Sequence, residues 1–141
     1  MKDKTIPEIF FKREGRLNRL RYFKRNLVIA LIMFVAMVVV SLIFVDDEGN
    51  FLKIVNIIAF ILGLATVVPS YCLMVRRLHD MDKDAVLANA YAVGCVGGYI
   101  LKFILEYEFM PLDIVLMIVL LYVLFVPGTH GANRYGADPL A

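Results

Sequence analysis

An uncharged, strongly apolar stretch over residues 27–45 is the feature that most restricts how this chain can fold. It follows a polar segment, residues 1–26, in which nine positions are Lys or Arg. A helix needs about 20 apolar residues to cross the hydrocarbon core of a bilayer, which is about 30 Å thick. A basic flank stays on the cytoplasmic side. Together they predict an integral membrane protein whose N-terminus lies in the cytoplasm.

Composition supports a chain that lies mostly within the membrane. Apolar residues make up 61% of it, whereas a soluble domain has nearer half. We therefore expect an all-α fold: an integral membrane bundle of four transmembrane helices, preceded by a short interfacial N-terminal helix. The predicted segments are a basic cytoplasmic segment at 1–26, spans at 27–45, 51–75, 85–105 and 112–126 within a transmembrane domain at 27–126, and a Gly-rich cytoplasmic tail at 127–141.

The charges between the spans alternate in sign. Basic residues lie at 1–26, at 76–77 and at 134, whereas acidic residues lie at 46–48 and 106–113. Basic loops remain in the cytoplasm, so this alternation predicts four spans with both termini cytoplasmic. The basic N-terminal segment is too long for a cleaved signal peptide. The charge asymmetry indicates membrane orientation rather than nucleic-acid binding.

Two features lie inside the predicted spans. Pro69 interrupts the second span, and a proline there removes a helical hydrogen bond and favours a kink. Ala90, Gly94 and Gly98 recur at four-residue spacing in the third span, which lets two helix backbones approach closely. Packing within the monomer is the favoured interpretation of that spacing, and homodimerisation is the alternative.

The remaining polar and sulfur-bearing residues of the spans indicate no metal or redox site. Cys72 and Cys95 both lie in apolar segments and are interpreted as small buried hydrophobic residues. Asn56, Asn89 and Tyr91 are scattered, so no span shows a clear polar stripe of the kind that lines a pore. We expect no cofactor and no bound metal.

Three polar motifs reach the predicted cytoplasmic surface, at 15–19, 76–80 and 127–139. Here the chain resembles a bacterial integral membrane family known as domain of unknown function 805. The family pattern has a Phe before Gly-Arg-x-x-Arg, a Pro followed by Arg-Arg-Leu-His-Asp, and a closing Pro-Gly-Thr-x-Gly-x-Asn-Arg-Tyr-Gly-x-Asp-Pro. The matching residues are Phe11, Gly15, Arg16, Arg19, Phe23, Pro69, 76–80 and 127–139. The resemblance implies a location in the bacterial inner membrane and a fold, but no activity.

The motifs supply a candidate site for an anion. Arginine presents a planar fork that binds phosphate through two hydrogen bonds. The hypothesis is that these residues bind an anionic lipid head group, a small anion or a protein partner: Arg16, Arg19, Arg76, Arg77, His79, Asn133 and Arg134. For each arginine taken alone, the simpler interpretation is that it fixes the orientation of the neighbouring span. Asp80 and Asp138 are expected to pair with arginines of the other motifs and so lock the helix ends together.

We therefore expect a non-enzymatic inner-membrane protein with a polar, ligand-binding cytoplasmic face. One alternative is a small membrane enzyme that acts on a lipid or phosphate-bearing substrate through His79, Asp80 and the arginines. A second is an oligomeric pore or transporter assembled through Ala90, Gly94 and Gly98. The expected partners are membrane lipids, anionic ones among them, with a homo-oligomer as an alternative and no nucleic acid.

Overall fold

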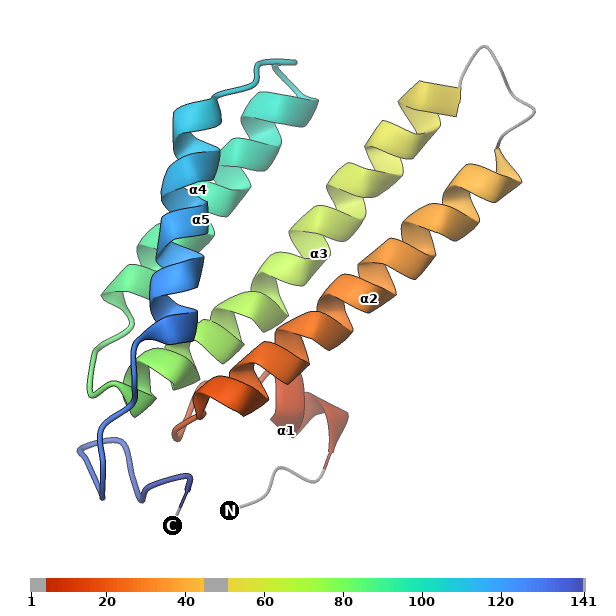
Figure 1. The fold of residues 1–141 in the computed structure, drawn as a ribbon. Coiled ribbons are helices and arrows are strands. Elements are labelled where there is room, and N and C mark those ends of the chain that lie inside the picture. Colours follow the sequence, from red (N-terminus) through yellow and green to blue (C-terminus); the bar gives the residue numbers. More distant parts are fainter. Residues whose placement is uncertain (1–4, 45–50, 141) are drawn as a thin grey trace.

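A computed structural model describes residues 5–44 and 51–140, and every helix or strand assigned in these ranges is an α-helix. Figure 1 shows two antiparallel hairpins, α2 with α3 and α4 with α5, and a short α1 beside them. The described N- and C-terminal segments lie at one end of the bundle, called here the terminal end, and the end of α2, the start of α3 and the connection from α4 to α5 lie at the other, the loop end. The helices are α1 (Ile6–Phe10), α2 (Arg19–Ile43), α3 (Phe51–Asp80), α4 (Val86–Phe103) and α5 (Met110–Phe125).

The first two helices begin with local capping. In α1 the carboxylate of Glu8 accepts a hydrogen bond from the Thr5 N–H at 3.1 Å, which holds one of the free donors of the first turn. At α2 the side chain of Asn18 accepts from the Arg21 N–H at 2.9 Å. No glycine or proline occurs in residues 19–44. The basic lead-in and the first predicted span therefore form one continuous helix.

α3 extends beyond the predicted second span. The predicted span stops at residue 75, but the helix runs through Pro69 and continues to Asp80. Its 30 residues give a length of about 45 Å at 1.5 Å per residue, whereas the hydrocarbon core is about 30 Å thick. The helix is therefore longer than the apolar layer, and its last turn, residues 76–80, holds most of its charged residues.

Three helices, α2, α3 and α4, are long and apolar enough to cross a membrane. α5 is apolar but has only 16 residues, which corresponds to about 24 Å. It begins at Met110, ahead of Asp113, with a proline in its first turn. The acidic segment 46–48 predicted between the first two spans lies outside the described residues.

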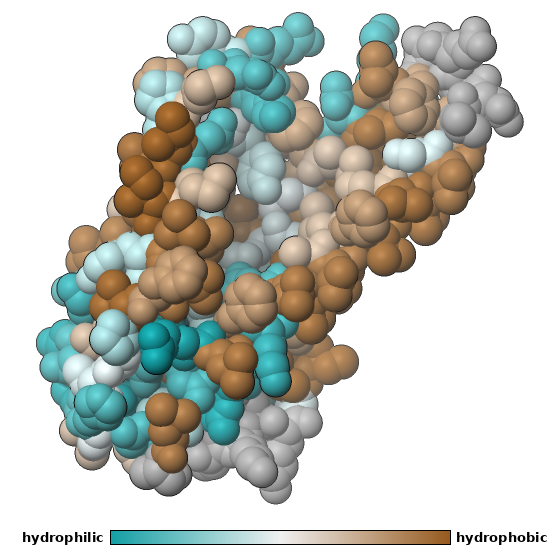
Figure 2. Space-filling model, viewed as in Figure 1, coloured by the Kyte–Doolittle hydropathy of each residue, from teal (hydrophilic) through white to brown (hydrophobic). Residues whose placement is uncertain are grey.

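The closely packed core lies toward the terminal end of the bundle. Its members include Leu17, Tyr22, Leu78 and Val123, each 2% exposed or less. The flanks of α2, by contrast, expose large apolar side chains such as Ile32, and the surface in Figure 2 is largely brown along that helix. Such an extended apolar surface is not found on soluble monomers, and it fits contact with lipid tails.

Candidate functional site

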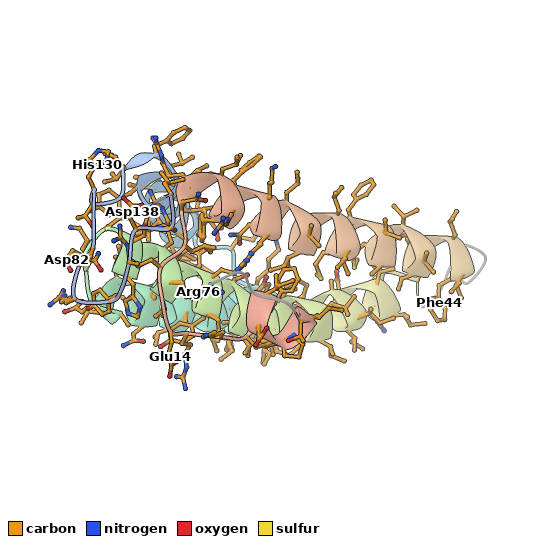
Figure 3. All side chains as sticks on the ribbon, turned by 90° about the horizontal axis from the view of Figure 1, so that it is seen from below. Glu14, Phe44, Arg76, Asp82, His130 and Asp138 are labelled. Atoms are coloured by element: carbon orange, nitrogen blue, oxygen red, sulfur yellow. The ribbon has the colours of Figure 1, made fainter. Side chains whose placement is uncertain are left out.

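The three polar motifs of the sequence converge at the terminal end. Figure 3 shows residues from the tail, such as His130 and Asp138, at the same end of the molecule as Asp82, with Phe44 at the opposite end. The segment that precedes α2 and the tail that follows α5 both pack on the last turn of α3. The Leu17 N–H donates to the Arg76 carbonyl at 3.0 Å, and the Thr129 N–H donates to the Asp80 carbonyl at 2.8 Å.

Arg77 is completely buried, and each of its guanidinium nitrogens donates to a different acceptor. Its Nε donates to the carbonyl of Val123 at 3.0 Å. Its Nη1 donates to the carboxylate of Asp80, and its Nη2 donates to the carbonyl of Val126. The two carbonyls belong to the end of α5, where helical acceptors lack backbone partners. Arg77 therefore ties α5 to α3.

Arg16 makes the corresponding connection to the tail. It is 7% exposed, and its Nε donates to the second oxygen of the Asp80 carboxylate at 3.1 Å. Its Nη1 donates to the Gly131 carbonyl, and its Nη2 donates to the Thr129 carbonyl at 2.5 Å. We call Arg16, Arg77, Asp80 and Thr129 the Arg–Asp cluster.

The tail approaches the Arg–Asp cluster too closely for any side chain at residue 128. A Cβ on Gly128 would lie 2.1 Å from Oδ2 of Asp80, which is far inside van der Waals contact. The Thr129 hydroxyl also donates to the Asp80 carbonyl at 3.1 Å. The Pro-Gly-Thr sequence at the start of the tail is thus explained by this contact.

The geometry restricts what the buried arginines can do. The Asp80 carboxylate accepts from one guanidinium at each oxygen, so the three side chains form a buried, hydrogen-bonded ion cluster. Removal of one partner from such a cluster typically costs about 3–5 kcal/mol. The donors of Arg16 and Arg77 point at protein acceptors rather than outward. Arg16 and Arg77, together with Asp80, therefore connect α5 and the tail to the end of α3.

His79 and Asn133 lie beside this cluster. The His79 ring stacks on the Tyr135 ring with a centroid separation of 3.8 Å and an interplanar angle of 7°. The Asn133 amide donates to the His79 carbonyl at 2.9 Å, so it positions the tail. Among the described residues, no three His, Cys, Asp or Glu side chains gather in a way that could hold a metal ion.

The other candidate residues are spread more widely. Arg76 is 4% exposed and donates to the Glu8 carbonyl at 3.2 Å. Arg19 is exposed and donates to the Phe125 carbonyl at 3.5 Å. Asp138 lies in the tail, where it accepts from the Leu140 and Gly131 N–H groups, each at 2.9 Å. These two hydrogen bonds, with that from Leu140 first, hold the pKa of the Asp138 carboxyl below its usual value.

Arg134 belongs to an open groove at the terminal ends of α4 and α5. It is exposed and pairs with Asp82 at 3.3 Å, and its guanidinium lies 4.8 Å from the centroid of the Tyr135 ring. Lys83 lies on the same groove, with Nζ 5.6 Å from the centroid of the Tyr122 ring. The groove has a volume of about 480 Å³. We call it the α4 groove, and its lining includes Leu78, Asp82, Lys83, Asp84, Leu87, Tyr122 and Arg134.

Gly94 of α4 packs closely against α5. A Cβ on Gly94 would lie 2.9 Å from Leu116 of α5, whereas one on Gly98 would lie 3.6 Å from Leu112, an ordinary contact distance. Ala90 is exposed and lines the α4 groove. The close approach of α4 and α5 thus accounts for Gly94.

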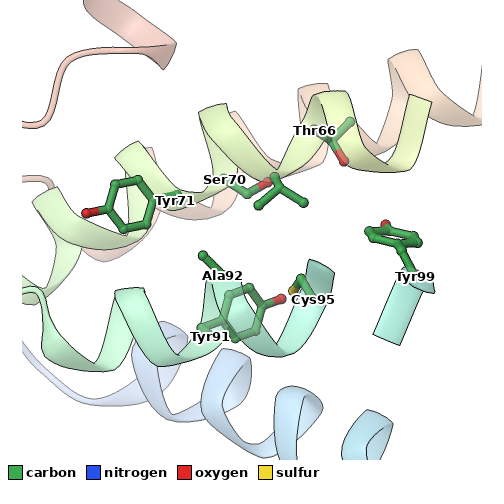
Figure 4. Close-up of a pocket in the computed structure, with 8 residues that line it drawn as sticks. Thr66, Ser70, Tyr71, Tyr91, Ala92, Cys95 and Tyr99 are labelled. Carbon is green, nitrogen blue, oxygen red and sulfur yellow. The ribbon is translucent and has the colours of Figure 1, made fainter. Parts of the chain in front are cut away.

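Sequence reasoning missed a polar stripe. On the side of α4 that faces α3, Tyr91, Cys95 and Tyr99 recur every four residues, and Thr66 and Ser70 of α3 face them across a small pocket (Figure 4). The spacing of the α4 residues is a helical period visible in the sequence. It was hidden because tyrosine and cysteine count as apolar in a hydropathy reading and because the two halves of the stripe lie on different helices.

These features define an all-helical membrane protein whose polar sequence motifs close one end of the bundle. The chain belongs to the family described as "Protein of unknown function (DUF805)", which matches residues 10–137. It is similar to the inner membrane protein YhaI of Escherichia coli strain K12 and of Escherichia coli O157:H7, each 33% identical over 97 residues. The alignment covers 61% of this chain and 66% of those relatives, slightly less than two thirds of their length. No solved structure matches the chain.

Proposed function

We propose that this is a four-span inner-membrane protein that binds the phosphate of a membrane phospholipid at the α4 groove. In this proposal α5 is the fourth span, both termini are cytoplasmic, and α1 lies at the interface. The inner-membrane location is supported by the E. coli relatives and by the apolar helices. The orientation is supported by the basic residues at 12–25, 76–77 and 134, all toward the terminal end.

The observation that carries the proposal is the combination of apolar and charged side chains in one groove. Leu87 and Tyr122 contribute to an apolar floor, and Lys83 and Arg134 are the basic side chains of a charged rim. In this proposal the charged last turn of α3 lies past the apolar layer, which puts the groove at the depth of lipid head groups. An acyl chain can lie along the floor while the phosphate contacts the two basic side chains.

The charges of the groove favour one kind of head group. Two acids, Asp82 and Asp84, lie beside the two bases, and Asp82 is the partner of Arg134. A purely anionic head group would meet the carboxylates as well as the bases. Phosphatidylethanolamine carries a phosphate and an ammonium group, so it can satisfy both signs. We therefore expect it to be preferred over phosphatidylglycerol.

The test compares two variants with the same loss of charge. Lys83→Gln/Arg134→Gln removes both groove bases, whereas Arg21→Gln/Lys24→Gln removes two exposed bases of α2 that lie outside the groove. The Arg134–Asp82 pair is exposed, and such pairs contribute about 0–1 kcal/mol, so the groove variant is expected to stay folded. Each protein is placed in nanodiscs that contain equal amounts of phosphatidylethanolamine and phosphatidylglycerol, and the retained lipid is measured by native mass spectrometry.

We expect the wild type and the α2 variant to retain phosphatidylethanolamine and the groove variant to lose most of it. Equal retention in all three proteins contradicts lipid binding at the groove. Preferential retention of phosphatidylglycerol contradicts the charge-balance argument. Displacement of the lipid by inorganic phosphate alone would show that the groove selects a free anion instead.

A further inference from the structure

The polar stripe between α3 and α4 encloses a second cavity, away from the α4 groove. It is lined by eight residues and has a volume of about 90 Å³. Figure 4 shows Thr66 and Ser70 of α3 and Tyr91 and Cys95 of α4 around it. We call this cavity the polar pocket, and its polar lining residues are Thr66, Ser70, Tyr71, Tyr91, Cys95 and Tyr99.

Some of these polar groups already have local partners. The Thr66 hydroxyl donates to the Gly63 carbonyl at 2.7 Å, and the Tyr71 hydroxyl donates to the Asn89 side chain at 2.9 Å. Polar side chains are costly at the depth of a membrane, and where they gather on an inward face they commonly mark a binding site or a pathway. Hydroxyl and thiol groups from two helices that face one shared space form such a site.

A larger, charged cavity lies between the same two helices toward the loop end. Its volume is about 700 Å³. Lys53 and Asn56 line it from the start of α3, and Lys102 lines it from the end of α4. Lys102 also pairs with the exposed Glu108 at 3.5 Å. We call this space the charged cavity, and Figure 2 shows hydrophilic residues on both sides of the hollow at the loop end.

A layer of three aromatic rings lies between the two spaces. Phe60 and Phe103 have centroids 5.8 Å apart, and Tyr99 and Phe103 have centroids 6.1 Å apart. Phe103 lines the charged cavity and Tyr99 lines the polar pocket. Gly63 makes room for this layer, because a Cβ there would lie 2.7 Å from the Tyr99 ring. We call Phe60, Tyr99 and Phe103 the aromatic layer.

We propose that the polar pocket binds a small uncharged solute that bears hydroxyl or amide groups, and that the solute arrives through the charged cavity when the rings of the aromatic layer rotate. None of the eight described lining residues carries a formal charge. An ion would lose its hydration there without a counter-charge, whereas a neutral solute can exchange its water for the hydroxyl groups. A volume of about 90 Å³ corresponds to about three water molecules at about 30 Å³ each.

The first test measures access to the native Cys95 thiol. Cys72 is 4% exposed and is replaced in Cys72→Ala, which leaves Cys95 as the single thiol. A small uncharged, hydroxyl-bearing methanethiosulfonate that does not cross the membrane is added to sealed vesicles in which the loop end faces the reagent. We expect Tyr99→Ala in this background to raise the rate of Cys95 modification at least tenfold. Tyr107→Ala, which removes an exposed tyrosine outside the aromatic layer, is expected to leave the rate unchanged.

A milder variant controls for loss of the fold. Phe103→Leu keeps most of the apolar volume of the aromatic layer but removes the ring that contacts Tyr99, and we expect an intermediate rate. If both substitutions leave the rate at its original value, the aromatic layer does not control access and the proposal fails. Equal modification by reagent added at the terminal end would also overturn the access route.

The second test asks what the polar pocket accepts. Modification of Cys95 is repeated in the Cys72→Ala/Phe103→Leu protein, which keeps all the residues that line the polar pocket. The added solute is glycerol or lactate, which has the same number of non-hydrogen atoms as glycerol but is charged. Glycerol is expected to slow the reaction in a saturable way, and lactate is expected to have no effect. Protection by neither solute, or equal protection by both, would overturn the assignment of a neutral ligand.

Discussion

The substitution Asp80→Asn tests the role of the Arg–Asp cluster directly. One carboxylate oxygen accepts from Arg16 and the other from Arg77. An asparagine amide keeps one acceptor but turns the other position into a donor, so one buried guanidinium loses its partner and both lose the negative charge. Breaking a buried ion cluster in this way costs about 3–5 kcal/mol. That is a large part of the 5–15 kcal/mol that stabilises an ordinary domain.

The assay is hydrogen exchange in detergent or nanodiscs, read at the Thr129 amide. In the wild type this N–H donates to the Asp80 carbonyl at 2.8 Å, so it exchanges only when the tail opens. At 1.4 kcal/mol per factor of ten, a loss of 3–5 kcal/mol predicts exchange faster by about 100-fold to a few thousand-fold.

A matched variant controls for the loss of a carboxylate. Asp84 is exposed and accepts from the Val86 N–H at 3.2 Å ahead of α4, and Asn caps a helix about as well as Asp. Asp84→Asn is therefore expected to leave exchange at Thr129 unchanged. If Asp80→Asn changes that exchange rate by less than a factor of ten while the protein stays folded, the buried-cluster reasoning is refuted.

Three further predictions follow from the same contacts. Gly128→Ala should free the tail about as strongly as Asp80→Asn in the same exchange assay, and the combination of the two should add little, because both break one contact. Gly94→Leu should lower the free energy of unfolding by about 1–3 kcal/mol through overpacking against Leu116. It should change hydrogen exchange within the tail little. The pKa of Asp138 is lowered in the folded tail, so its contacts should be complete above the unfolded pKa of about 4 and lost as the pH falls through the folded value. Resonances of the tail should report that loss in an NMR titration, and Asp138→Asn should abolish the titration.

The helices could be predicted from the sequence because apolar stretches of membrane length have few alternative structures. The residues at which the helices begin and end were harder to predict. The sequence separates the basic segment from the first span, although no helix-breaking residue lies between them and α2 is continuous. The predicted second span stops at residue 75, just before Arg76, yet the helix extends to Asp80, and its charged side chains Arg76, Arg77 and Asp80 are buried.

The polar motifs could be recognised but their arrangement could not be derived. Arginines near a membrane surface suggest lipid head groups, and only the fold shows that the acceptors for Arg16 and Arg77 are carbonyls of α5 and the tail. The polar pocket was not predicted from the sequence for a different reason. Its residues have nearly neutral hydropathy, and they form a site only when α3 and α4 face each other at Thr66 and Tyr91.

The contact between Arg16 and the tail has a consequence for the order of events during biosynthesis. The arginine is translated more than a hundred residues before the Thr129 and Gly131 carbonyls that it binds. All five described helices have been translated before those acceptors exist. A nascent chain that stalls after α5 would hold two arginines without their full set of partners, in a segment meant to be buried. The contacts of Arg16 with the tail can therefore form only after residues 129–131 have been made.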